Sequence, residues 1–159
     1  RSAQNILLSV EESLCDEVTH SAFKLHELGY KIHCTKGTKK FMDKVGVPCV
    51  ALEYPCDMGV EGSNDEENVI TYLKTGKIDL CINIPTHKSK RLNDNYDMRR
   101  TAVDFNVPLM TNMQVVNVFT NAANLYHAGE FTGLDAKKLF DYYKEEKEVD
   151  AWTDPNEFH

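Results

Sequence analysis

Two threonines, Thr35 and Thr38, flank a glycine directly after a short apolar run at residues 30–34. A helical pattern follows, so this TKGT stretch is expected where a strand gives way to a helix. Backbone N–H groups in the first turn of a helix attract anions, and threonine hydroxyls can add further donors. The stretch therefore suits the binding of a small anion. An ordinary helix-capping turn explains the same residues equally well.

Two asparagines mark a second polar region. Asn83 lies near the end of the strongly apolar stretch 78–84, and an amide in that position needs hydrogen-bonding partners. Asn95 opens the next helical pattern, where a capping role is sufficient to explain it. The charged side chains of the loop between them are either solvated or close over an anionic ligand. Its basic residues are His87, Lys88, Lys90 and Arg91.

Motifs for several other chemistries are absent. The chain has neither G-x-G-x-x-G nor a P-loop, and it lacks the G-x-S-x-G nucleophile motif. Its six histidines show no metal-ligand spacing with cysteines or carboxylates. Glu66 and Glu67 could supply a general base, but acidic residues at a helix start more often complement the helix dipole. The sequence predicts no catalytic residue and no metal site.

Strand and helix patterns alternate along the chain and position these loops. Strands are predicted at residues 5–10, 31–34, 47–53, 78–84 and 107–111, and helices at 13–28, 39–44, 66–74, 95–105, 112–123 and 134–147. This order predicts a doubly wound, five-stranded, mainly parallel α/β sheet with helices on both faces. Ligands bind such sheets at the carboxyl ends of the strands. Thr35, Asn83 and Asn112 are therefore expected at one edge.

Length and composition bound the remaining possibilities. The 159 residues predict one domain over residues 1–149, followed by a frayed tail at 150–159. A net charge of −7 argues against a nucleic-acid or membrane partner. No apolar run approaches the roughly 20 residues that span a bilayer. The start at Arg1 suggests a processed chain or a piece of a longer one. Cys34, Cys49 and Cys81 are expected to be buried thiols in a reducing, intracellular compartment.

Three stretches carry a resemblance to a known family: DLCINIP at residues 79–85, DNYDMRRTAVD at 94–104 and VPLMTN at 107–112. With LDAKKLFDY at 134–142, they are similar to the C-terminal regulatory domain of carbamoyl-phosphate synthetase, which has the methylglyoxal-synthase-like fold. The ammonia-using, urea-cycle type is the most similar. The resemblance covers roughly residues 5–127. It implies a Rossmann-like domain that catalyses nothing itself but binds an effector that controls the remaining synthetase domains.

The resemblance also implies what the domain binds and where. In the urea-cycle type the effector is N-acetyl-L-glutamate, a small anion, and the parent is an ATP- and Mg-dependent ligase in mitochondria; other types are cytoplasmic. The domain itself is expected to need no cofactor. The implied effector residues that match the family are Thr35, Thr38, Asn83 and Asn95. Tyr54 stands where the family has Trp, and Thr86 stands where it has Asn. Asn112, expected at the same sheet edge, completes the candidate set.

Two other members of the fold remain as alternatives. Methylglyoxal synthase needs a Gly-Gly-Asp-Gln stretch whose Asp is the base, whereas this chain has NDEE at residues 64–67 with Glu66 at the Asp position. A base displaced by one methylene is badly placed, so the lyase interpretation is rejected. The regulatory domain of the pyrimidine-pathway synthetase binds uridine nucleotides or phosphoribosyl pyrophosphate. The basic loop at residues 87–91 would suit such a polyphosphate.

Overall fold

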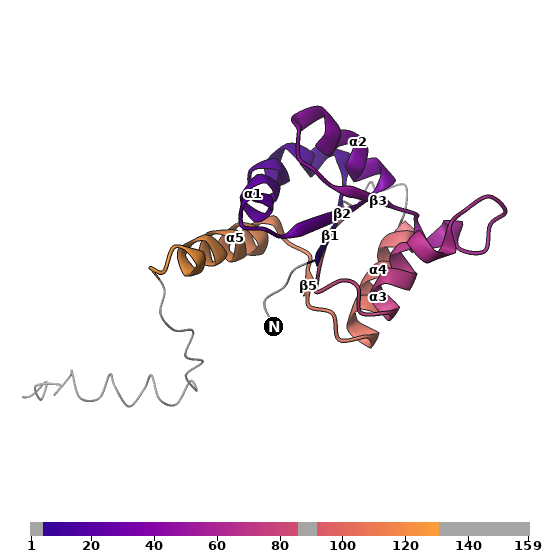
Figure 1. The fold of residues 1–159 in the computed structure, drawn as a ribbon. Helices are drawn as coiled ribbons and strands as arrows, with labels where there is room; N and C mark the ends of the chain where they lie inside the picture. The colour runs from indigo at the N-terminus through magenta and orange to yellow at the C-terminus, as the bar shows by residue number, and fades with distance from the viewer. Residues whose placement is uncertain (1–4, 86–91, 131–159) are drawn as a thin grey trace, which may run out of the picture.

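The computed structural model describes residues 5–85 and 92–130, which form a five-stranded sheet flanked by helices (Figure 1). The strands are β1 (Asn5–Val10), β2 (Lys31–Thr35), β3 (Val50–Leu52), β4 (Leu80–Ile84) and β5 (Leu109–Met110). The α-helices are α1 (Cys15–Glu27), α2 (Lys36–Val45), α3 (Val69–Lys74), α4 (Leu92–Asp104) and α5 (Met113–His127). Short 3-10 helices are η1 (Glu12–Leu14), η2 (Pro55–Asp57) and η3 (Asp65–Glu67).

The strands run parallel in the order β3-β2-β1-β4-β5, which confirms the predicted doubly wound fold. The chain first winds outward from β1 to β3 and then crosses to β4 on the other side of β1. This reversal makes the carboxyl edge between β2 and β4 the place where an open α/β sheet accommodates a ligand.

The two faces of the sheet carry separate cores. Along β1, Ile6 and Leu8 pack in one cluster with residues of α1 and α5, whereas Leu7 packs in a second cluster with residues of α3 and α4. The alternation follows from the twofold period of a strand, whose successive side chains point to opposite faces. Figure 1 shows the same division, with α1, α2 and α5 on one side and α3 and α4 on the other.

Several elements differ in length from their predicted ranges. β3 begins at Val50 instead of residue 47, because Gly46 ends α2 in the left-handed conformation (φ 78°) and Pro48 has no N–H to donate. α2 begins at Lys36, three residues earlier than predicted. The predicted helix at residues 134–147 and the tail at 150–159 lie outside the described residues.

The cysteines follow the prediction in part. Cys34 and Cys81 are fully buried, whereas Cys49 is only half-buried, so the expectation of a buried thiol is wrong for Cys49. Burial raises the pKa of the Cys81 thiol to about 12, which keeps it protonated and unreactive.

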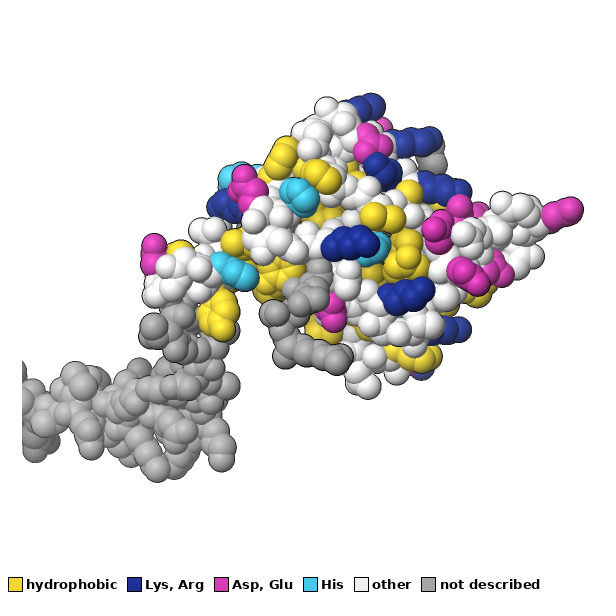
Figure 2. All heavy atoms as spheres, in the orientation of Figure 1, with side chains coloured by type: hydrophobic (Ala, Val, Ile, Leu, Met, Phe, Trp, Pro, Cys, Tyr) yellow, Lys and Arg dark blue, Asp and Glu magenta, His cyan; other side chains and the backbone are white. Residues whose placement is uncertain are grey.

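The segment between β3 and α3 projects from the body of the molecule and carries much of the acidic charge (Figures 1 and 2). Glu61, Asp65 and Glu66 are all exposed there. Their carboxylates therefore form a solvated surface, which agrees with the simpler interpretation of this acidic stretch.

Candidate ligand-binding site

Polar side chains cross three neighbouring strands at the carboxyl edge of the sheet. Thr35 ends β2, and its hydroxyl lies 3.5 Å from the Ser9 hydroxyl of β1. Ser9 is in turn the register partner of Asn83 in β4. All three are buried. Thr35 and Asn83 therefore belong to one region, as the strand pattern predicts.

A cavity of about 390 Å³ opens at this edge. The end of β1, the first turns of α2, Tyr54 beyond the end of β3 and the start of α4 enclose it. Four of the predicted site residues line it: Thr35, Thr38, Tyr54 and Asn95. These four come from three separate segments of the chain, which the parallel sheet brings together.

The two threonines are bound into the protein rather than free in the cavity. The Thr38 hydroxyl accepts a hydrogen bond from Val10 N at 3.1 Å and donates to Val10 O at 3.2 Å. It also lies 3.2 Å from the Thr35 hydroxyl. Within the described residues, the Thr35 side chain makes no capping hydrogen bond at the start of α2. The capping interpretation therefore does not account for Thr35.

Asn83 stands behind the cavity and supports its wall. Its Nδ2 donates to Asn95 Oδ1 at 2.9 Å, which connects the end of β4 to α4. The Asn83 side chain is fully buried, and its Oδ1 has no hydrogen-bond partner among the described residues. A buried amide oxygen without a partner costs free energy. A donor that reached this oxygen would therefore be bound favourably.

Two lysines on α2 add positive charge that the sequence reasoning missed. Lys40 and Lys44 line the cavity four residues apart, so they share one face of the helix. The ion pairs found in the described part of the chain do not include either lysine. The sequence signal that could have indicated them is the i, i+4 spacing of the two lysines after the TKGT turn. Glu11, Glu12 and Asp94 also line the cavity, so its charge is mixed.

Asp94 is a second residue that the sequence did not single out. It is buried at the start of α4, where its Oδ1 accepts from Cys56 N at 2.9 Å and its Oδ2 lies 3.4 Å from the Cys56 Sγ. These bonds fix η2 against α4 on one side of the cavity. No local pattern indicates such a contact, because the two residues lie 38 positions apart.

The structure does not bring Asn112 to the cavity. Asn112 is exposed and caps α5, where its Oδ1 accepts from Gln114 N at 2.7 Å and from Val115 N at 3.4 Å. It is not among the described residues that line the cavity, so its edge position has a capping explanation. Thr86 and the basic loop at 87–91 lie outside the described residues.

Two kinds of feature are absent from the described residues. They contain no cluster of three or more His, Cys, Asp or Glu side chains that could hold a metal ion. In the same part of the chain, no helix has the length and apolar character needed to cross a bilayer.

Comparisons with known proteins identify similar sequences and folds. The model of the MGS-like domain family matches residues 17–111. The chain is 34% identical over 140 residues to "Carbamoyl-phosphate synthase [ammonia], mitochondrial" of Homo sapiens and covers 9% of that protein. It is 31% identical over 135 residues to "Carbamoyl phosphate synthase large chain, C-terminal section" of Methanocaldococcus jannaschii and covers 21% of it. These matches use 87% and 85% of this chain, whereas the chain spans only 9% and 21% of the two relatives.

A solved structure extends the likeness to the fold. The crystal structure of ForH superposes with a TM-score of 0.53 at 15% sequence identity, and the match covers 82% of this chain and 83% of that one. At this identity the match supports the α/β architecture alone.

Proposed function

The chain belongs to the MGS-like domain family, and from that premise we propose that it is the allosteric regulatory domain of a carbamoyl-phosphate synthetase. The observation that carries the proposal is the cavity at the carboxyl edge, lined by Thr35, Thr38, Tyr54 and Asn95. A domain of this kind binds an effector and controls carbamoyl phosphate synthesis in the remaining synthetase domains. ATP and Mg act in those domains and not in this one.

N-acetyl-L-glutamate is the proposed effector, and three observations support it. The cavity of about 390 Å³ is large enough for a small dicarboxylate. The threonine hydroxyls, the Asn95 amide and the start of α2 supply neutral polar groups, and Lys40 and Lys44 add cations. The similarity to the mitochondrial ammonia-type protein extends over 87% of the chain. A mitochondrial location accompanies this proposal.

Two other functions have less support. The pyrimidine-pathway interpretation, with UTP, UMP or phosphoribosyl pyrophosphate as ligand, depends mainly on the basic loop at 87–91. The lyase interpretation needs Glu66 at the ligand. Glu66 is exposed in η3 and is not among the described residues that line the cavity. The geometry therefore favours a binding domain over an enzyme.

Titration calorimetry of the 159-residue chain tests the proposal. N-acetyl-L-glutamate should bind, and UTP should bind much more weakly or not at all. Thr38→Ala and Asn95→Ala should each weaken the binding, because both side chains line the cavity. If UTP bound more tightly than N-acetyl-L-glutamate, the domain would instead be assigned to the pyrimidine-pathway type of synthetase. Turnover of dihydroxyacetone phosphate that Glu66→Gln abolishes would overturn the regulatory function.

A further inference from the structure

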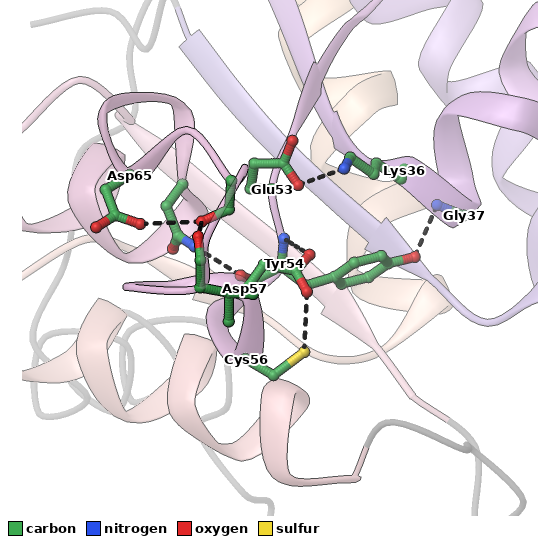
Figure 3. A network of polar contacts seen from close by, with 10 residues as sticks. Lys36, Gly37, Glu53, Tyr54, Cys56, Asp57 and Asp65 are labelled. Carbon is green, nitrogen blue, oxygen red and sulfur yellow. Dashed lines mark hydrogen bonds and ion pairs between the residues drawn. The ribbon is translucent and has the colours of Figure 1, made fainter.

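The Tyr54 side chain already occupies a polar position in the cavity wall. Its phenol oxygen accepts a hydrogen bond of 2.7 Å from the backbone N–H of Gly37, the second residue of α2 (Figure 3). The first N–H groups of a helix have no partner within the helix and carry its positive dipole end. An acidic group of a ligand would accept a hydrogen bond from the same N–H. A side chain of the protein therefore accepts from an N–H group of the kind that binds anions.

The absence of a side chain at residue 37 makes this contact possible. A Cβ atom built on Gly37 would lie 2.7 Å from the Tyr54 hydroxyl oxygen, closer than real Cβ contacts. The glycine thus allows the phenol to reach the backbone. It would equally allow a carboxylate or phosphate oxygen to reach the same N–H once the ring moved away.

The backbone of Tyr54 is fixed, so only its ring is able to move. The fully buried Asn68 donates from Nδ2 to Tyr54 O at 2.6 Å. Tyr54 N donates to Asp57 Oδ2 at 3.3 Å, and the bridge between Glu53 and Asn68 continues this anchorage. The ring itself is half-buried at the cavity mouth. Rotation about the side-chain torsions would release Gly37 without disturbing these backbone bonds.

A second contact keeps the two segments together when the phenol leaves. Lys36, the first residue of α2, forms an ion pair with Glu53, the residue before Tyr54 (Figure 3). The start of α2 and the end of β3 therefore stay adjacent when the Tyr54–Gly37 bond opens. The exchange of one acceptor for another is then a local event within the cavity.

From this geometry we propose that Tyr54 is a competing internal ligand that determines which effectors bind. It occupies the Gly37 N–H until an acidic group displaces it. The inference rests on the proposed function, because it assumes that an acidic effector enters this cavity. It adds a selection rule: a ligand must offer the Gly37 N–H a stronger acceptor than a phenol oxygen. Carboxylates and phosphates meet that condition, because hydrogen bonds to ionised acceptors are about twice as strong as neutral ones.

The test is Tyr54→Phe, which keeps the ring and removes only the hydroxyl. The unliganded variant should exchange its Gly37 amide proton faster than the wild type, measured by NMR on the 159-residue chain. N-acetyl-L-glutamate, used as the probe, should bind on the order of three- to tenfold more tightly by calorimetry, the gain expected when one neutral hydrogen bond no longer has to be broken.

Tyr72→Phe is the matched control. Tyr72 packs against His33 and does not line the cavity, so loss of its hydroxyl should leave the affinity unchanged. Equal binding by wild type and Tyr54→Phe, or weaker binding by the variant, would overturn the inference and leave the proposed function intact. Failure of both proteins to bind the probe would overturn the proposed function and the inference together. Binding by the variant alone would support both.

Discussion

The Thr38 hydroxyl belongs to the fold as much as to the cavity. It is 2% exposed and exchanges two hydrogen bonds with the backbone of Val10, the last residue of β1. Removal of the hydroxyl would leave a buried N–H and a buried carbonyl of β1 without this partner, so Thr38 contributes to the stability of the fold.

Thr38→Val should therefore destabilise the protein by about 1–3 kcal/mol, the cost of leaving buried polar groups unpaired. Thr35→Val is the control, since within the described part of the chain its hydroxyl contacts only other side chains, at 3.2 and 3.5 Å. It should cost less. Urea unfolding measures both free energies. Equal stability of wild type and Thr38→Val would mean that the bond to Val10 does not form in solution.

The start of α2 shows what a sequence pattern is able to predict at the scale of elements. The strand-to-helix order around residues 30–45 is visible in the apolar spacing. The exact start of the helix at Lys36 is not visible in the sequence. Gly37 has low helix propensity, and its N–H is satisfied by Tyr54, a residue 17 positions away. Such long-range partners also explain why Asp94 was missed. Thr35, Thr38 and Asn95 were predictable, because strand ends and helix starts have local signatures.

For Asn112, in contrast, a local role is enough: the capping of α5 explains why this residue follows β5. Asn112→Ala should destabilise the protein by about 0.5–2 kcal/mol through loss of the α5 cap. Effector affinity should not change, because Asn112 does not line the cavity within the described residues. Asn112→Asp, which keeps an acceptor at the cap, should restore most of the stability. If Asn112→Ala lost affinity for the effector but kept normal stability, Asn112 would have to be counted among the effector-binding residues.

At the scale of the whole molecule, the middle of the sheet contains a buried titratable group. His33 in β2 is 4% exposed and packs edge-on against Tyr72, with ring centroids 5.4 Å apart. Its Nε2 lies 3.4 Å from Asn5 Oδ1, and its Nδ1 has no partner among the described residues. Burial, and then the nearby Lys31, lowers the pKa of His33 from its ordinary value.

This lowered pKa predicts a loss of stability in mild acid. As the pH falls below about 6.5, the unfolded chain binds a proton at His33 that the folded chain does not, so the free energy of unfolding decreases. Thermal melts between about pH 7.5 and 5.5 should show this fall, and His33→Gln should reduce it. His20→Gln, on the exposed surface of α1, is the control and should leave the wild-type slope. An identical slope in His33→Gln would exclude His33 as its source.

The central position of β1 has a consequence for synthesis of the chain. β1 pairs with β2 a short distance along the sequence, but its pairing with β4 joins residues about 74 positions apart, as in the Asn5–Asp79 bond. A nascent chain therefore makes β1 first and cannot cover one of its edges until β4 leaves the ribosome. Until then this apolar strand presents unpaired N–H and C=O groups to other chains. Because this long-range pairing forms slowly, chaperone contact with β1 would be most important for preventing aggregation during that interval.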